Sequence, residues 1–323
     1  METGFSGVVR VDLEGGLSLE QAHGYAHRGW GIRNEVDTVL GIASGTKGVI
    51  ALTVMSLARD ALLPLSAPAR TWLGDDLPLI DDRVTVEQLL GHTSGIGDYF
   101  DEEALGDIDD YALAIPVSDL STTAAYLPIL AGHPMVSEPG ERFRYCNGGF
   151  VVLALLAERA GGADLPELVA TRVCGPAGMT STAFLRSDEL PGGVASGYLE
   201  GFDGLRTNVL HLPVRGGGDG GLYTTAADVR AMWEAMFSGR LVGPEAVEAM
   251  VRPRSDVPEL RRRYGLGFWL HATGDQVILE GYDAGVSFFS VHQPSTSSTH
   301  TVLANTSSGA DPVHRFLVEL LGF

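Results

Sequence analysis

Alternating apolar and polar residues predict β-strands at both ends of the chain. Phe5 to Leu13 alternate in this way and end at Glu14-Gly15-Gly16, which is typical of a strand that closes in a hairpin turn. The stretches 24–31 and 38–42 have the pattern of further strands. Near the other end, the pattern predicts strands at 264–270, 276–280, 287–292 and 301–305, followed by a helix over 313–321.

Helical periodicity dominates the stretch between these strands. Residues 44–59 have apolar positions at helical spacing and no internal proline, so Ser44 is predicted to lie at a strand-to-helix junction. Thr225-Ala226-Ala227-Asp228 has the form of a capping box and predicts a helix to about Phe237. Between Pro64 and Pro213, helices are predicted at 86–90, 122–130, 149–160 and 165–173.

Strands at both ends with helices between them predict an α/β fold with a discontinuous domain. We expect residues 1–63 and 214–323 to form that α/β domain, and residues 64–213 to form a mostly helical insertion. The length of 323 residues and a hydrophobic content of 45% allow a core of this size.

The charge balance excludes several classes of partner. The net charge of −19 argues against nucleic acid, because the densest basic run is only Arg261 to Arg263. The longest apolar stretch, Phe150 to Ala157, is too short to span a bilayer. Met1-Glu2-Thr3 has no following apolar segment of the signal-peptide type, so we expect a cytoplasmic protein without a membrane partner. The oligomeric state is left open.

The sequence predicts no metal or organic cofactor. Cys146 and Cys174 are too few for a disulfide framework. His23 and His27 are four residues apart but flank a glycine-rich strand, which is a poor setting for a metal site. The glycine run at 216–221 is not followed by the Gly-Lys-Ser/Thr of a phosphate-binding loop.

Lys47 is the only lysine in the chain, and it follows Ser44 by three residues. The other 21 basic residues are arginines. Arginine keeps its proton at accessible pH, whereas a buried lysine amine can lose it. A lysine retained beside a serine therefore suggests a need for an amine that can be deprotonated. An ordinary surface lysine is equally compatible with the count alone.

The Ser-x-x-Lys spacing at the start of a helix places both side chains on one helical face. A serine hydroxyl becomes a good nucleophile when a nearby base takes its proton, and a lysine can serve if burial lowers its pKa. We therefore expect the pKa of Lys47 to lie well below the ordinary value of about 10.4. The helix N-terminus also offers N–H groups to a developing oxyanion.

A second candidate element is Tyr145-Cys146-Asn147, which follows Pro139-Gly140 at a loop-to-helix junction. A tyrosine phenol can relay protons there, and an asparagine amide can bond both to a lysine and to a substrate. The alternative interpretation is a buried tyrosine and an asparagine that caps the helix.

Together these residues resemble the serine β-lactamase and penicillin-binding-protein superfamily, in the branch of class C β-lactamases, D,D-peptidases and family VIII esterases. Two further segments carry the resemblance: Leu89-Leu90-Gly91-His92-Thr93-Ser94-Gly95, and the glycine-rich run at 218–225 before a helix capped by threonine. The resemblance implies a β-lactamase-like fold, with an antiparallel sheet flanked by helices and an active site in the cleft beside the helical insertion. His92 is expected to hold a loop rather than to act in catalysis.

The resemblance also implies roles for individual residues. Ser44 matches the acylated nucleophile and Lys47 the amine that activates it. Tyr145 matches the phenol that relays protons, and Asn147 the amide that orients both the substrate and Lys47. Two coupled groups titrate as a pair, so the division of labour between Lys47 and Tyr145 stays open.

The chain departs from the family at the third motif, a Lys-Thr-Gly or His-x-Gly on the strand beside the site. The matching segment is Glu280-Gly281-Tyr282-Asp283-Ala284-Gly285. We favour the register in which Tyr282 takes the Lys/His place and the Gly285 N–H joins the Ser44 N–H as oxyanion donor. The alternative register reads Asp283-Ala284-Gly285, with an acid in place of the cation.

Either register lacks the cation that binds the carboxylate of penicillins and D-alanyl termini. We therefore expect a serine hydrolase that forms an acyl-enzyme on Ser44 and acts on a carboxylic ester or amide of a small molecule, with weak or no penicillin hydrolysis. One alternative is a genuine class C-type β-lactamase or D,D-peptidase acting on a β-lactam or peptide. A further alternative is a catalytically inactive binding or sensor module.

Overall fold

The computed structural model describes the whole chain except residues 1–3, 15, 17, 101–105, 107, 202–203 and 323. The strands are β1 Gly7–Asp12, β2 Ser18–His23, β3 Tyr25–His27, β4 Ile32–Arg33, β5 Leu40–Gly41, β6 Tyr198–Gly201, β7 Gly204–Thr207, β8 Tyr223–Thr224, β9 Ser255–Val257, β10 Arg262–Tyr264, β11 Trp269–His271, β12 Val277–Asp283, β13 Val286–Gln293 and β14 Ser298–Ala304. The helices are α1 Thr46–Arg59, α2 Arg70–Leu73, α3 Val86–Leu90, α4 Leu127–Leu130, α5 Asn147–Gly161, α6 Leu165–Val169, α7 Gly175–Ala177, α8 Ala226–Phe237, α9 Pro244–Val251 and α10 Ala310–Leu321.

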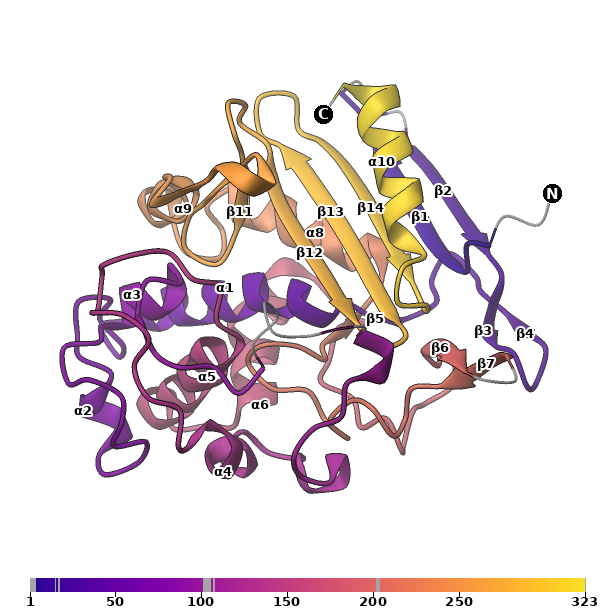
Figure 1. Cartoon of the computed structure of the whole chain (residues 1–323). Coiled ribbons are helices and arrows are strands. Elements are labelled where there is room, and N and C mark those ends of the chain that lie inside the picture. Colours follow the sequence, from indigo (N-terminus) through magenta and orange to yellow (C-terminus); the bar gives the residue numbers. More distant parts are fainter. Residues whose placement is uncertain are drawn as a thin grey trace.

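One antiparallel sheet organises the molecule (Figure 1). Within the described residues its strand order is β2-β1-β14-β13-β12-β11-β10-β9. β1 lies beside β14, with Gly7 opposite Ala304 and Asp12 opposite Thr299, so segments from the two ends of the chain are adjacent. This arrangement confirms the predicted antiparallel sheet flanked by helices. The division at residues 63 and 213 stays a prediction.

Helices cover both faces of the sheet. α10 packs on β13 and β14 from one side, and α8 packs on β1 and β14 from the other. Every residue of β14 is buried, including Thr299 and Thr301. Their hydroxyls bond to His292 at 2.8 Å and to Ser290 at 2.9 Å, so these polar groups are satisfied inside the core.

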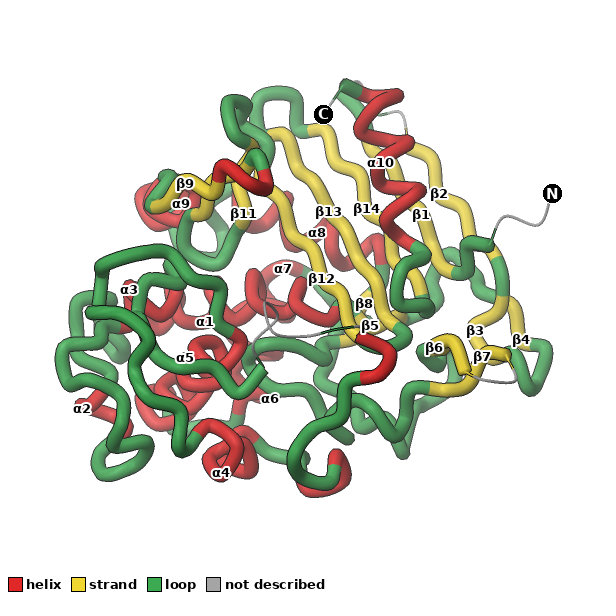
Figure 2. Tube along the Cα trace, in the orientation of Figure 1, coloured by secondary structure: helices red, strands yellow, loops and turns green. Residues whose placement is uncertain are grey.

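Two helices that are buried over most of their length form the centre of the molecule. α1 is buried from Thr46 to Leu57, and α5 is buried from Asn147 to Ala157. A helix buried on every side lies in the interior of a protein, and here the two helices contact each other. Figure 2 shows the helices α2 to α6 grouped beside one end of the sheet. No helix in the described part of the chain has the length and apolar character needed to cross a membrane.

Several details of the predicted elements are wrong. The stretch 24–31 is a strand only at Tyr25–His27, and residues 28–31 form a turn. The stretch 264–270 is not one strand, because Gly265 to Phe268 form a turn between β10 and β11. Gly267 has φ +83°, and a Cβ there would lie 2.2 Å from the Cβ of Ala51, so the turn requires glycine at this close approach to α1.

The predicted capping box is only half formed. Thr225 caps α8 by accepting the N–H of Asp228, as expected. The Asp228 carboxylate, however, accepts from the Ser181 N–H at 2.8 Å and the Thr182 hydroxyl at 2.7 Å. The acid therefore joins α8 to a distant loop, which sequence spacing alone does not reveal.

A pair of buried histidines joins α10 to the sheet. His300 on β14 and His314 on α10 share a hydrogen bond of 3.0 Å, and the ring of His314 stacks on Phe289. Burial lowers the pKa of His300 to about 3 and that of His314 to about 4. Both imidazoles are therefore neutral in the folded protein near neutral pH.

The pH dependence of stability should reveal these imidazoles. Below pH 6.5 the imidazole of residue 314 binds a proton in the unfolded chain, whereas in the folded protein it stays neutral until about pH 4. The free energy of unfolding should therefore fall as the pH falls from about 6.5 towards 4. In His314→Phe, the slope measured by urea unfolding between pH 4.5 and 6.5 should decrease by up to about 1.4 kcal/mol per pH unit. An unchanged slope would show that His314 titrates normally.

Candidate active site

Ser44 lies in a tight turn between strand β5 and helix α1. The turn is the 3-10 segment Ala43–Gly45, and the N–H of Ile42 anchors it by donating to the carbonyl of Leu222 at 3.0 Å. Ala43 has φ +42°, a left-handed conformation that is unfavourable for a residue with a side chain. Such strain is frequent at functional sites. The predicted strand-to-helix junction at Ser44 is confirmed.

Lys47 is a buried side chain at the meeting point of three segments. Only 2% of it is exposed. Its Nζ lies 2.8 Å from the Ser44 Oγ, 2.8 Å from the Asn147 Oδ1 and 2.7 Å from the main-chain oxygen of Asp219. The single lysine is therefore not a surface residue, and it connects α1, α5 and the glycine-rich loop.

Asn147 is the first residue of α5, where its amide is held at both ends. The Oδ1 accepts from Lys47, and the Nδ2 donates to the main-chain oxygen of Phe100 at 3.1 Å. The N-cap of α5 is Cys146, whose sulfur accepts the N–H of Gly149. Asn147 is therefore not the cap that the alternative interpretation supposed.

Asp98 holds this helix start in place. Its carboxylate accepts the N–H of Asn147 at 2.6 Å, that of Gly148 at 2.8 Å and that of Phe100 at 3.2 Å. A carboxylate at a helix N-terminus also meets the positive end of the helix dipole. Burial raises the pKa of Asp98, and these three hydrogen bonds oppose that rise.

Tyr145 is packed between aromatic rings. Its ring stacks on Trp269 with a centroid distance of 5.9 Å and lies 4.4 Å from the ring of His92. The Lys47 Nζ is 5.0 Å from the centroid of the Tyr145 ring. The structure thus brings Ser44, Lys47, Tyr145 and Asn147 together, as the two sequence motifs predict.

His92 lies beneath Tyr145 in the buried core. Its Nδ1 accepts the N–H of Cys146 at 3.1 Å, which fixes the chain just before Asn147. Burial lowers the pKa of His92 well below 6.5, and Lys47 lowers it further. A neutral, buried imidazole that holds a loop agrees with its expected structural role.

The glycine-rich loop contributes Asp219, which sequence reasoning missed. Asp219 is the one residue with a side chain within Gly216–Gly221, which is the signal that could have identified it. Its carboxylate accepts the hydroxyl of Tyr99 at 2.6 Å. Burial raises the pKa of Asp219, an effect that Lys47 partly offsets. A Cβ at Gly218 would lie 2.0 Å from the main-chain oxygen of Phe150, so only glycine allows the loop to lie against α5.

The third motif does not have either predicted register. Gly281 is the residue of β12 that lies on the nucleophile turn, since a Cβ there would be 2.2 Å from the oxygen of Ile42 and 2.7 Å from the nitrogen of Ser44. Gly281 thus takes the glycine place of Lys-Thr-Gly. The lysine place, two residues earlier, falls to Leu279, which is buried in the core.

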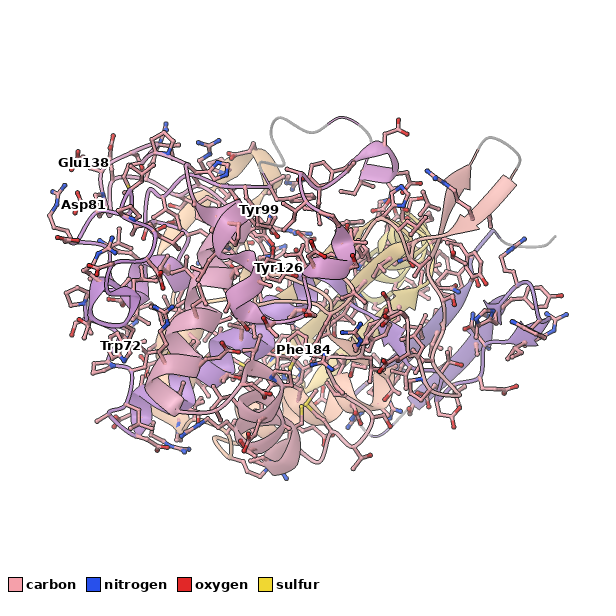
Figure 3. The ribbon with its side chains drawn as sticks, turned by 90° about the horizontal axis from the view of Figure 1, so that it is seen from below. Trp72, Asp81, Tyr99, Tyr126, Glu138 and Phe184 are labelled. Carbon is pink, nitrogen blue, oxygen red and sulfur yellow. The ribbon has the colours of Figure 1, made fainter. Side chains whose placement is uncertain are left out.

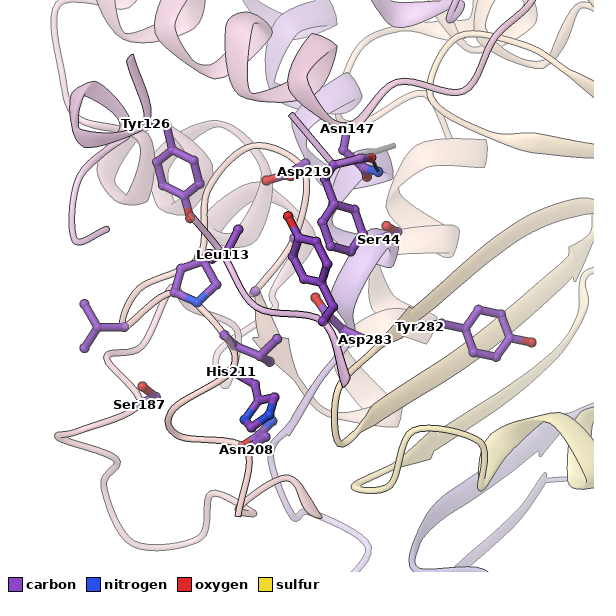
Figure 4. A pocket seen from close by; sticks show the side chains of 18 of the residues that line it. Ser44, Leu113, Tyr126, Asn147, Ser187, Asn208, His211, Asp219, Tyr282 and Asp283 are labelled. Atoms are coloured by element: carbon purple, nitrogen blue, oxygen red, sulfur yellow. Dashed lines mark hydrogen bonds between the residues drawn. The ribbon is translucent and has the colours of Figure 1, made fainter. Parts of the chain in front are cut away.

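The Gly285 N–H and the Tyr282 ring also lie elsewhere than the favoured register supposed. The Gly285 N–H donates to the hydroxyl of Ser307 at 2.8 Å, and Gly285 lies in the turn after β12. The Tyr282 ring packs edge-on against Phe289, on the sheet face that α10 covers. Figure 4 shows the Tyr282 ring directed away from Ser44.

A pocket opens beside Ser44 (Figure 4). Its walls come from the segment after α3, the start of α5, the loop after β7, the glycine-rich loop and the end of β12. They include Ser44, Tyr99, Phe100, Tyr111, Tyr126, Asn147, Asn208, His211, Asp219, Tyr282 and Asp283. Figure 3, viewed from below, shows Tyr99 and Tyr126 near each other. Within the described residues, no group of three or more His, Cys, Asp or Glu side chains could hold a metal ion.

A family model described as Beta-lactamase matches residues 1–321. The chain belongs to this family. One solved structure similar to this Beta-lactamase family member is a penicillin-binding protein from Bacillus halodurans, with 35% sequence identity and a TM-score of 0.92. The similarity covers 98% of this chain and 97% of the Bacillus halodurans chain.

Two curated relatives are longer than this Beta-lactamase family chain. Protein PbpX of Bacillus subtilis (strain 168) is 26% identical over 273 residues, which are 83% of this chain and 63% of PbpX. Esterase EstB of Burkholderia gladioli is 29% identical over 305 residues, which are 85% of this chain and 76% of EstB. The chain thus spans less than two thirds of PbpX and about three quarters of EstB.

The hydrogen bonds of Asp98 predict a large stability effect. Asp98→Ala removes the acceptor of three N–H groups at a buried helix start, so the free energy of unfolding should fall by about 2–3 kcal/mol. Asp164→Ala removes the exposed cap of α6, which accepts one N–H, and should lower the free energy of unfolding by only about 1 kcal/mol. Urea unfolding of both variants measures the difference, and equal losses would contradict the role assigned to Asp98.

Proposed function

We propose that the protein is a serine hydrolase that forms an acyl-enzyme on Ser44 and acts on a carboxylic ester or amide. One observation carries this proposal: the buried Lys47 Nζ lies 2.8 Å from the Ser44 Oγ. A candidate base within hydrogen-bond reach of a nucleophile is the geometric requirement for this chemistry. The family membership and the esterase relative support the same conclusion.

The reaction begins when Lys47 is neutral. The Ser44 hydroxyl then donates its hydrogen bond to Nζ, and its oxygen attacks the substrate carbonyl as the proton passes to the amine. The tetrahedral intermediate collapses, the bond to the leaving group breaks, and the leaving group takes up from the Lys47–Tyr145 pair the proton that came from Ser44. Water then gives a proton to the same pair and attacks the acyl carbonyl. The bond to the Ser44 Oγ breaks, the carboxylic acid is released, and the proton returns to Oγ.

Tyr145 and Asn147 support these proton transfers. The Lys47 Nζ lies 5.0 Å from the centroid of the Tyr145 ring, so the tyrosine lies beside the amine, and we assign its phenol the exchange of protons with the leaving group. Asn147 holds the amine through its Oδ1. Lys47 and Tyr145 act as a coupled pair, and the geometry assigns no single step to either residue.

The oxyanion site is proposed to use the main-chain N–H groups of Ser44 and Tyr282. β11 pairs with β12 only at Val277 and Ile278, so strand pairing leaves the later part of this edge of β12 open beside the nucleophile turn. Tyr282 follows Gly281 on this edge and lines the pocket with Ser44. Its N–H replaces that of Gly285, which is already bonded.

The third motif disfavours carboxylate-bearing substrates. The family places a cation where this chain has Leu279, a side chain that is 3% exposed. An apolar group cannot form the charge-assisted hydrogen bond that a penicillin carboxylate accepts. An ester or amide without that carboxylate is therefore favoured over a β-lactam or a D,D-peptide. A non-catalytic binding module would not require the contact between Ser44 and Lys47.

Active-site labelling tests the proposed nucleophile. The protein incubated with a fluorophosphonate should gain the mass of one phosphonyl group on Ser44, and Ser44→Ala should gain none. A fluorescent penicillin should give little or no adduct, because the carboxylate lacks its cation. Intact-mass spectrometry reads both results. Absence of any adduct on the wild-type protein would overturn the hydrolase proposal.

The role of Lys47 is tested by two substitutions. Lys47→Met fills a similar volume without an amine, and Lys47→Arg keeps a charge that cannot be lost. Both should lower the rate of phosphonylation by roughly 10²–10⁴-fold, the range expected for loss of a general base. Circular dichroism and thermal unfolding confirm that each variant is folded. A folded variant that reacts at the wild-type rate would exclude Lys47 as the activating group.

A further inference from the structure

One short segment after α3 positions two of the groups that hold the Lys47 amine. The Phe100 main-chain oxygen accepts from the Asn147 Nδ2 at 3.1 Å, which turns the Oδ1 of the same amide towards Lys47. The preceding residue, Tyr99, donates its hydroxyl to the Asp219 carboxylate at 2.6 Å, and the main-chain oxygen of Asp219 accepts from Lys47 at 2.7 Å. The segment therefore acts on the amine through both α5 and the glycine-rich loop.

Asp219 brings a carboxylate close to that amine. Its main-chain oxygen contacts the Lys47 Nζ, so the carboxylate of the same residue lies near the ammonium group. Lys47 and the Tyr99 hydroxyl both favour the ionised form of Asp219, against the burial that raises its pKa. Asp219 and Asn147 lie together beside Ser44 at one end of the pocket (Figure 4). The steps of the proposed reaction use neither this carboxylate nor Tyr99, although both lie beside its base.

The other titratable groups around Lys47 are neutral or already bonded. Burial lowers the pKa of His92 well below 6.5 and raises that of the Cys146 thiol well above 9, so both are neutral near pH 7. Tyr145 presents its ring, with the centroid 5.0 Å from Nζ. The Asp98 carboxylate accepts three N–H groups at and near the start of α5.

The groups that face Asp219 itself are phenols, acids and Lys47. The charge of Asp219 raises the pKa of Asp98 and of the phenols of Tyr99, Tyr111 and Tyr126. Asp283 lines the same pocket. Lys47 is the cation that lowers the pKa of Asp219, so the charges of these two residues are coupled.

A buried amine needs a nearby negative charge to act as a base near neutral pH. Lys47 is 2% exposed, and burial among neutral acceptors can lower the pKa of a lysine to about 5–6. An amine with so low a pKa is neutral but weakly basic, whereas the most effective general base has a pKa near the working pH. A carboxylate about 4–6 Å away raises the pKa of an amine by about one to three pH units.

We propose that Asp219, held by the Tyr99 hydroxyl, is a positioning residue whose negative charge keeps the buried Lys47 amine basic enough to take the Ser44 proton near neutral pH. This inference rests on the proposed function, because it assigns a partner to the base of the same site. The main-chain oxygen of Asp219 orients Nζ, and its carboxylate sets the basicity. One residue of the glycine-rich loop thus controls both properties of the amine.

The single lysine makes the basicity of this amine directly measurable. Protein grown with lysine labelled with ¹³C at the ε-carbon gives one lysine signal, whose chemical shift follows the charge of Lys47. Asp219→Asn keeps the main-chain oxygen and an acceptor for the Tyr99 hydroxyl, and the pKa of Lys47 should fall in it by at least about one pH unit. The exposed Asp82→Asn removes the same charge outside the pocket and should leave that pKa unchanged.

The pH profile of Ser44 phosphonylation separates a change of basicity from a loss of structure. The rate should rise with pH as Lys47 loses its proton and then level off. In Asp219→Asn the rise should move to lower pH by the same amount as the pKa of Lys47, and the plateau should be lower because the amine is a weaker base. A purely structural defect would instead lower the rate by one factor at every pH, and that result would contradict the proposal.

The two proposals fail in different ways. If Ser44 is phosphonylated but folded Asp219→Asn leaves the pKa of Lys47 unchanged, the hydrolase stands and the role of Asp219 is wrong. If Ser44 is not labelled at any pH, the hydrolase proposal fails, and the carbon signal still tests the effect of Asp219 on Lys47.

A second variant and the wild-type protein cover the case in which Asp219→Asn does not fold. Asp219→Ala also keeps the main-chain oxygen, and it must then lower the pKa of Lys47. In the wild-type protein alone, a Lys47 pKa below about 6 would overturn the proposal, since that is the range of a lysine buried without a nearby anion.

Discussion

The buried ammonium group of Lys47 is the constraint on which the site depends. Burying an isolated cation is costly unless hydrogen bonds replace its water, and here the acceptors come from α1, α5 and the glycine-rich loop. Three segments that are distant in sequence must therefore converge within hydrogen-bond distance of one nitrogen. The nucleophile, the asparagine amide and one wall of the pocket are fixed relative to each other by this requirement.

The surrounding structure supplies the rigidity that such convergence needs. α1 and α5 are buried on all sides and contact each other, so neither can shift without disturbing the core. Asp98 fixes the start of α5, and Gly281 brings β12 against the turn that carries Ser44. Preorganisation of this kind favours catalysis, because little rearrangement is required as charge develops on the substrate.

Much of the fold and of the site could be predicted from the sequence, because these features depend on patterns among residues that are close in the chain. Strand alternation, the helix after Ser44 and the two motifs around Lys47 and Asn147 depend on neighbours in the chain. The register of the third motif could not be found in this way, because the segment holds two glycines, Gly281 and Gly285, and the sequence around either one can be aligned with the motif. Only the packing of β12 on Ile42 and Ser44 distinguishes them. Asp98 and Asp219 were missed because their partners come from segments distant in sequence.

The packing of Leu279 limits how this site can change over evolutionary time. A Cβ on Gly48 would lie 2.6 Å from a Leu279 methyl group, so the leucine fills the space that this glycine of α1 leaves open. A longer, charged side chain at position 279 would have to enter the same apolar contact, which also includes Phe268. A cationic side chain at position 279 would therefore require coordinated replacements on α1 and β12. A single substitution at this position would disrupt the packing of the core.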